Sequence, residues 1–143
     1  MHNVRKKLSL PIQWVVAEVK RAPVLRNSPA DLASAFAAHI AWVSAFGKHA
    51  LYRGHNNPTG IPWDKAYAAR YGASPGFPDN DGVLTRFRGL DDFVECYLQM
   101  YAHLLNLNAR AFFAHMQKND ITPNARRRWA KIVELWETDA FAE

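Results

Sequence analysis

The sequence predicts a single, mainly α-helical domain of α+β type over residues 1–143, with about five helices and a small β/loop lobe at 54–88. Apolar residues recur at helical spacing on both sides of that lobe, whereas the segment 54–82 holds five of the seven glycines and four of the eight prolines. Hydrophobic residues make up 49% and aromatic residues 13% of the chain, which favours a packed core over disorder.

The N-terminal segment is expected to form a helix over residues 9–22. Ile12, Val15, Val16 and Val19 would share its buried side. Basic residues at 5–7 resemble the start of a signal peptide, but Pro11 and Gln13 break the apolar run and Glu18 follows where small residues should lie. We therefore expect no signal peptide, and no run of the chain is long enough to span a bilayer.

The second helix has a strong predicted start. Ser28 would be its N-cap, Pro29 its first residue and Asp31 the second half of a capping box. Gly47 is a natural terminator. The expected buried stripe consists of Leu32, Phe36, Ile40 and Val43.

The Gly- and Pro-rich lobe at 54–88 is too long for a plain connection in a compact domain, which indicates a functional lobe. Within it, "HNNPTG" and "FPDNDG" have turn character, and "VLTRFR" at 83–88 alternates as a strand of a small antiparallel hairpin does.

Three further helices are expected after the lobe. The first covers 90–106, and one face of it would hold Leu90, Phe93, Tyr97, Tyr101 and Leu104. The second is "NARAFFAHMQK". The third is "TPNARRRWAKIVELW", with Thr122 as N-cap and Pro123 at its first position.

The charge balance is basic: 18 Lys and Arg face 13 Asp and Glu, for a formal net charge of +5. This favours a polyanionic partner such as nucleic acid, an anionic membrane or a bacterial cell wall, or else a solvated basic surface. The run Arg126–Arg128 points around most of a helix rather than along one stripe, so a solvated face is the simpler explanation and nucleic acid is not the partner we expect. Cys96 is the single cysteine, which excludes an intrachain disulfide and a cysteine zinc site and favours a buried structural thiol.

Three segments, in order, resemble bacterial peptidoglycan glucosaminidases. "SAFGKHALYRGHNNPTGI" resembles that family's "ESGWGKS"-like helix end and its "NNLFGIK" loop, through Gly47, Lys48, Asn56 and Asn57 among others. "LTRFRGLDDFVECYLQMY" is similar to its "FRxYxSxxxSxxDY" strand-to-helix step. "LWETDAFAE" is similar to its usual ending, "YATDPxYA".

The resemblance implies a lysozyme-like helical lobe facing a small β lobe across a glycan groove. It also places Val43 where the family has its catalytic Glu. A general acid must be a titratable carboxyl with a raised pKa, so valine cannot perform this step. Asp64, Asp79 and Asp81 are the acidic residues of the β/loop lobe and the weak remaining catalytic candidates. A base without its acid partner would be half a mechanism.

Histidines 39, 49 and 55 cluster around the same corner of the sequence. One of them could act as an acid, or two with Asp64 could bind a metal. Their spacings of ten and six residues do not match a helical ligand pair, so we favour groove-lining or capping roles and expect neither a metal site nor a cofactor.

"NNPTGI" is better explained as architecture, because Asn56 and Asn57 can bond back to the backbone and Gly60 permits positive φ. In the resembled fold this loop also lines the sugar groove, where nearby aromatic rings, two or three of them exposed, would stack on sugars. The expected glycan-binding set is Asn56, Asn57, Tyr52, Trp63, Tyr67 and Tyr97.

These observations favour a diverged glucosaminidase-like domain that binds glycan or serves as a structural module without efficient hydrolysis. Its partners would be peptidoglycan or a related glycan strand, and other subunits of a phage or secretion particle. The chain would be made in the cytoplasm and act at the bacterial envelope or in a phage particle. Two alternatives stay open: an active cell-wall glycoside hydrolase with a rearranged acid, and a basic adaptor that binds protein or nucleic acid.

Overall fold

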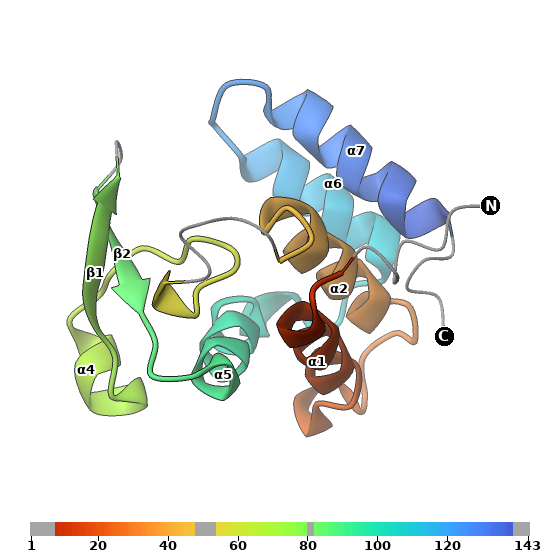
Figure 1. Cartoon of the computed structure of the whole chain (residues 1–143). Coiled ribbons are helices and arrows are strands. Elements are labelled where there is room, and N and C mark those ends of the chain that lie inside the picture. The colour runs from red at the N-terminus through yellow and green to blue at the C-terminus, as the bar shows by residue number, and fades with distance from the viewer. Residues whose placement is uncertain (1–7, 48–53, 80–81, 139–143) are drawn as a thin grey trace.

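The computed structural model of the chain describes residues 8–47, 54–79 and 82–138 (Figure 1). The described part is a mainly helical single domain with a small two-stranded antiparallel sheet, which confirms the expected fold class.

The helical body is built around α2 (Leu32–Val43). This helix contacts α1 (Leu10–Lys20), α6 (Ala109–Asn119) and α7 (Ala125–Glu137), whereas α5 (Leu90–Met100) packs on α1. In Figure 1, α6 and α7 lie side by side on one side of α2, and α1 and α5 lie on another. Two short 3-10 helices, Pro23–Leu25 and Ala102–Leu104, follow α1 and α5.

The lobe lies at the opposite end of the molecule from α7 (Figure 1). It contains α4 (Ala66–Tyr71) and a hairpin of β1 (Ser74–Asp79) and β2 (Gly82–Arg86). The two strands pair antiparallel, and their register shifts between Pro75 and Pro78. The expected strand at 83–88 is therefore confirmed as part of a hairpin, whereas α4 was not anticipated.

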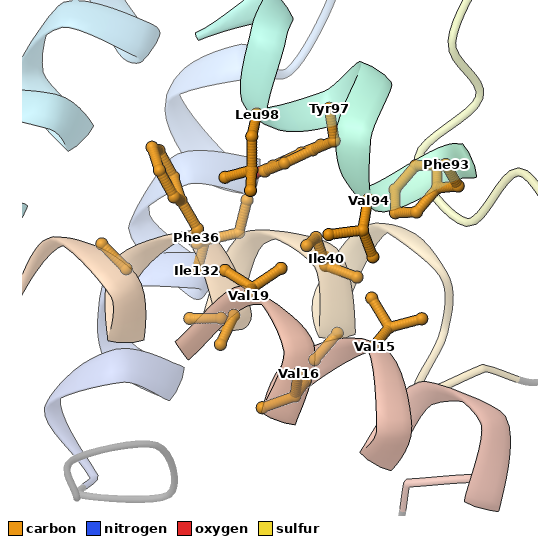
Figure 2. Close-up of a cluster of buried hydrophobic side chains, with 14 of the residues drawn as sticks. Val15, Val16, Val19, Phe36, Ile40, Phe93, Val94, Tyr97, Leu98 and Ile132 are labelled. Atoms are coloured by element: carbon orange, nitrogen blue, oxygen red, sulfur yellow. The ribbon is translucent and has the colours of Figure 1, made fainter. Parts of the chain in front are cut away.

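The hydrophobic core lies where α1 and α5 meet α2 (Figure 2). The four residues expected on the inner side of α1 are all buried, as are three of the four in the expected stripe of α2; Val43 is half-buried. Helical periodicity identified these faces correctly, because one side of each amphipathic helix must leave water.

Aromatic rings link the lobe to the helical body in a continuous series. Neighbouring ring centroids lie 5.0–6.3 Å apart, mostly edge to face, which is the favourable geometry for aromatic pairs. The series runs through Tyr71, Phe87, Phe93, Tyr97, Phe36 and Phe112.

Two predicted helix starts are wrong. The second helix begins at Leu32, with Asp31 in the N-cap position, so Ser28 and Pro29 lie before it. The Asp31 carboxylate accepts a hydrogen bond from the amide of Ala109 (2.9 Å), at the first residue of α6, instead of closing a capping box. The physical reason is that the unpaired amides of a helix start can donate to any nearby oxygen, including one from a distant segment.

The last helix begins at Ala125 rather than at Pro123, and Asn124 with φ 64° precedes it. Thr122, the predicted N-cap, instead donates its hydroxyl to the carboxylate of Asp120. The helix expected at 90–106 also divides, since α5 ends at Met100 and a 3-10 turn follows.

Candidate functional site

The corner after α2 is tightly constructed around Gly47. Val43 is the last residue of α2, and the chain then takes positive φ at Ala45, Phe46 and Gly47. The amide of Ser9 donates to the carbonyl of Phe46 (3.0 Å), which joins this corner to the start of α1. A Cβ at Gly47 would lie 2.1 Å from the Oγ atom of Ser9, so only glycine fits there. The chain therefore turns sharply after α2, as the sequence indicated, and the last helical residue before the turn is the aliphatic Val43.

Asn57 holds the loop of "NNPTGI" against the hairpin. Its Nδ2 atom donates to the carbonyls of Ile61 (3.0 Å) and Thr85 (2.9 Å), and its Oδ1 atom accepts from the amide of Ile61 (2.8 Å). Asn56 donates to the carbonyl of Phe87 (3.1 Å). The architectural interpretation of this loop is therefore confirmed. Asn57 is only 3% exposed, so its amide is committed to the backbone and not open to a glycan.

Of the three carboxylates in the lobe, the structure describes only that of Asp64. Asp64 is exposed, and its Oδ1 atom accepts from the amide of Ala66 (2.9 Å) at the beginning of α4. The side chain of Asp79 and the whole of Asp81 lie outside the described residues. The role of Asp64 is thus local: its side chain forms the turn that starts α4.

His39 is a buried, neutral residue. Its Nδ1 atom lies 2.7 Å from the hydroxyl of Tyr97, and its ring lies 5.0 Å from that of Trp129. Burial lowers the pKa of His39 from 6.5 to about 4, and the nearby Arg128 guanidinium adds to this shift. A histidine of this kind is not charged at neutral pH, and only 7% of the residue is exposed.

Of the other two histidines, the structure describes only His55. His55 is buried, and its ring lies so close to Gly76 of β1 that a Cβ there would be 2.3 Å from its Cδ2 atom. His49 lies outside the described residues. Among the side chains that the structure describes, no group of three or more His, Cys, Asp or Glu could hold a metal ion.

Two of the expected glycan-facing aromatics are partly exposed. Trp63 and Tyr67 are half-buried, with ring centroids 6.5 Å apart at 84°. Tyr97 is completely buried, so its assignment to a glycan groove is wrong; the α5 face that carries it is turned into the core. Tyr52 lies outside the described residues.

Cys96 on α5 contacts two tyrosines of α4. The thiol is 1% exposed, as expected for a structural cysteine. Burial raises its pKa, and hydrogen bonds with Tyr67 and Tyr71 oppose that shift. The hydroxyl of Tyr67 therefore points inward, and only part of its ring is left on the surface.

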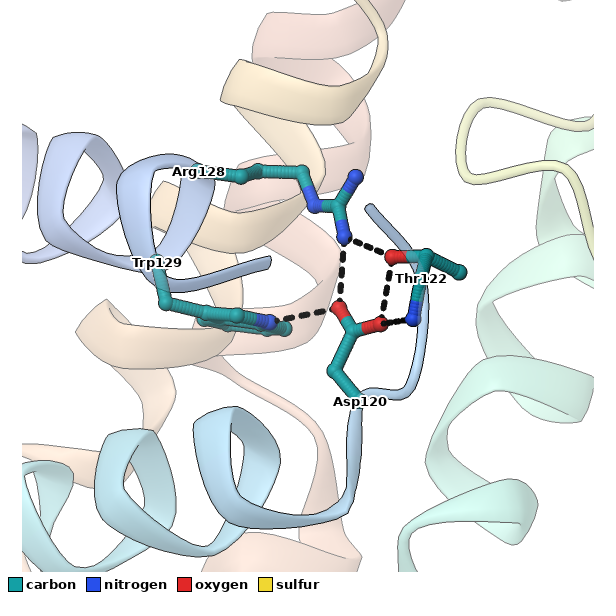
Figure 3. Close-up of polar contacts among 4 residues, drawn as sticks. All are labelled: Asp120, Thr122, Arg128 and Trp129. Atoms are coloured by element: carbon teal, nitrogen blue, oxygen red, sulfur yellow. Dashed lines mark hydrogen bonds and ion pairs between the residues drawn. The ribbon is translucent and has the colours of Figure 1, made fainter. Parts of the chain in front are cut away.

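A polar cluster at the start of α7 was missed by the sequence reasoning (Figure 3). The carboxylate of Asp120 accepts hydrogen bonds from the amide of Thr122 (3.0 Å), from Arg128 (2.7 Å) and from the indole of Trp129 (2.9 Å). Burial alone would raise the pKa of Asp120, but these hydrogen bonds outweigh it and hold the pKa well below its usual range. The spacing D-x-T before a helix was the available signal.

This cluster also corrects the interpretation of the arginine run. Arg126 and Arg127 are exposed, in line with a solvated face, but Arg128 is half-buried and is paired with Asp120. Its positive charge lies near enough to His39 to help lower the pKa of that residue.

The described residues therefore provide a partly exposed aromatic pair beside an exposed carboxylate. No protein-family model, curated protein or solved structure matches this chain. None of the described helices has the length and apolar character needed to cross a bilayer.

Proposed function

We propose that the chain is a glycan-binding module, descended from a glucosaminidase-like domain, that no longer hydrolyses its ligand. The observation that carries this proposal is the Trp63–Tyr67 pair, whose half-buried rings stand together on the lobe. Flat aromatic faces stack on the apolar faces of sugar rings, and the adjacent exposed Asp64 can accept hydrogen bonds from hydroxyl groups.

The rigidity of the pair supports this function. The amide of Trp63 donates to the carbonyl of Val83 (2.8 Å), and Pro62 bridges to Leu84, so the backbone of Trp63 is fixed to the hairpin. Tyr67 is fixed through its contact with Cys96. Because the rings need little ordering on binding, more of the contact energy remains for affinity.

The absence of hydrolysis rests on the chemistry at the end of α2. General-acid catalysis typically contributes about 10²–10⁴ in rate. Val43 cannot donate a proton, and the neutral, buried His39 cannot replace it. The Asp64 carboxylate already accepts a hydrogen bond from the amide of Ala66, the first residue of α4.

Retention on purified insoluble peptidoglycan tests the binding proposal. The wild-type chain should sediment with the glycan at an ionic strength of about 0.5 M, where attraction between exposed charges is largely screened. Trp63→Ala should abolish retention. Trp14→Ala, which removes an exposed tryptophan of α1, is the matched control and should leave retention unchanged. Equal loss in both variants, or wild-type retention that disappears with salt, would contradict the proposal.

Turbidity clearing of the same peptidoglycan tests the loss of hydrolysis. The wild-type chain should give no clearing, and Val43→Glu should stay folded, since position 43 is half-buried at a helix end. Clearing by the wild-type chain that is lost in Asp64→Asn would instead establish a hydrolase with a rearranged acid.

A further inference from the structure

Two histidines of the helical body lie side by side with their ring nitrogens uncommitted. His103 is exposed in the 3-10 helix Ala102–Leu104, and His115 is half-buried in α6. Their ring centroids are 6.1 Å apart, and the ring planes meet at 71°. Among the residues that the structure describes, neither ring takes part in a hydrogen bond or an ion pair, in contrast to His39, whose Nδ1 atom is bonded to Tyr97.

Ring contact is the simplest explanation of the pair, but it uses only part of what the two side chains offer. The separation and angle suit an edge-to-face contact. Such contacts stabilise a fold mainly when ring area is buried, whereas His103 is exposed. The contact also uses none of the nitrogen lone pairs. The pair therefore presents two imidazoles that are available to a ligand.

The spacing of the rings suits a shared metal ion. An imidazole nitrogen binds Zn²⁺ at about 2.1 Å, which places the ring centroid about 3.2 Å from the ion. Two rings on one ion therefore have centroids at most about 6.4 Å apart, and about 5.2 Å apart at the tetrahedral angle. The observed 6.1 Å lies within that limit, and the exposed side chain of His103 can turn to close the remaining distance.

Both rings are carried on fixed backbone. Leu104, which follows His103, is buried, and its amide donates to the carbonyl of Tyr101 (2.9 Å). Helix α6, which carries the second ring, is tied at its start by the hydrogen bond from the amide of Ala109 to the carboxylate of Asp31 (2.9 Å). Because the supports need not move, little binding energy would be lost in ordering them.

The ligand type selects the ion. Imidazole suits Zn²⁺, Cu²⁺ and Ni²⁺, whereas Mg²⁺ and Ca²⁺ take oxygen ligands. The described side chains form no group of three or more metal ligands, so water would complete the coordination. The charge of Lys118, one turn further along α6, opposes a cation, but this residue is exposed and its charge is screened by solvent.

We propose that His103 and His115 bind one divalent transition-metal ion, of the class to which Zn²⁺ belongs. The ion would join the 3-10 helix that follows α5 to α6. It would stabilise the folded chain, since the two ligands are brought together by folding. The pair lies in the helical body and the Trp63–Tyr67 pair lies in the lobe, so this proposal does not depend on glycan binding.

Calorimetric titration of the untagged chain with Zn²⁺ at neutral pH tests this proposal. The wild-type chain should bind Zn²⁺ and should not bind Mg²⁺. The double substitution His103→Gln, His115→Gln should weaken Zn²⁺ binding at least about tenfold, since loss of an outer-shell partner alone typically costs about 10–100-fold. Both residues are at least partly exposed, so the fold should be retained, which a circular dichroism spectrum checks.

His2→Gln, His49→Gln is the matched control. It removes the two histidines that lie outside the described residues and should leave Zn²⁺ binding unchanged. In NMR spectra, the imidazole signals of His103 and His115 should shift together as Zn²⁺ is added, whereas those of the buried His39 should not. No Zn²⁺ binding by the wild-type chain, equal binding by the His103/His115 variant, or loss of binding in the control would each overturn the proposal and leave the pair as a ring contact only.

Discussion

The Nδ1 atom of His39 on α2 and the hydroxyl of Tyr97 on α5 lie 2.7 Å apart, and their hydrogen bond is buried. It joins two helices that are far apart in the sequence. Tyr97→Phe would leave a buried ring nitrogen without its partner, so we expect the free energy of unfolding to fall by about 1–3 kcal/mol in urea titrations. Tyr101→Phe is the matched control on the next turn, and it should lower the free energy of unfolding by less. Equal losses would contradict a specific role for this hydrogen bond.

The depressed pKa of His39 predicts a loss of stability in mild acid. Its folded-state pKa, about 4, lies below the ordinary value of 6.5, so protonation favours the unfolded chain. The contribution of the neutral ring is complete above pH 6.5 and is lost as the pH falls towards 4. Unfolding free energies at several pH values in this window should fall more steeply for the wild-type chain than for His39→Gln, which cannot titrate. Parallel slopes would exclude His39 as the cause.

Asp120 acts in a lower pH window. Because its pKa is held well below the usual range, its stabilising effect is present above the pKa of an unfolded aspartate and is lost as the pH falls below it. At neutral pH, Asp120→Asn should lower the free energy of unfolding by about 1 kcal/mol, since the site is partly exposed to solvent. Glu134→Gln removes an exposed surface pair with Lys131 and should have little effect. A larger effect of Glu134→Gln would contradict this ranking.

Gly47 is the position least tolerant of a side chain. Gly47→Ala would combine a φ of 83° with a Cβ that lies 2.1 Å from Ser9 Oγ and 2.5 Å from Ile12 Cγ1, and should cost about 3 kcal/mol or more. Gly60 has a φ of 70°, and a Cβ added there would meet no heavy atom within 4 Å, so Gly60→Ala should cost only about 1 kcal/mol. Chemical denaturation measures both, and similar costs would disprove the close contact at Gly47.

Asn57 and Asn56 should differ sharply although they are neighbours. Asn57→Ala removes three buried hydrogen bonds with backbone groups and should destabilise the lobe by about 2–4 kcal/mol. Asn56→Ala removes one partly buried hydrogen bond and should cost about 1 kcal/mol. Hydrogen exchange at the amides of Ile61 and Thr85 reports the lobe directly, and unchanged protection in Asn57→Ala would contradict this account.

The helical faces of this protein followed from local pattern. The buried side of α1, three of the four residues in the stripe of α2 and the hairpin strand were predicted correctly, because burial periodicity and turn residues act within a few positions of each other. Helix starts were predicted less well. Both Ser28 and Thr122 have the right chemistry for an N-cap, yet Asp31 and Asn124 stand at those positions.

The candidate site shows the same division. Asn57 was correctly assigned to the architecture of its loop, because its partners Ile61 N and O are four residues away. Its third partner, Thr85, and the burial of Tyr97 depend on how the lobe and α5 pack. The cluster of Asp120 could have been suspected from its spacing to Thr122, but not its hydrogen bond with Trp129, whose ring lies against His39.

The sequence by itself determined where the five longer helices lie, although not their starts or the short α4, which of their sides are apolar, and that valine stands at the end of α2. Only the tertiary structure decided which partners the polar side chains would bind. Asp31 accepts a hydrogen bond from the first amide of a helix that begins 78 residues later, and His39 meets Tyr97 across 58 residues. A hydrogen bond needs a partner within about 3 Å and is indifferent to separation along the chain, so such pairs become visible only when the helices are packed.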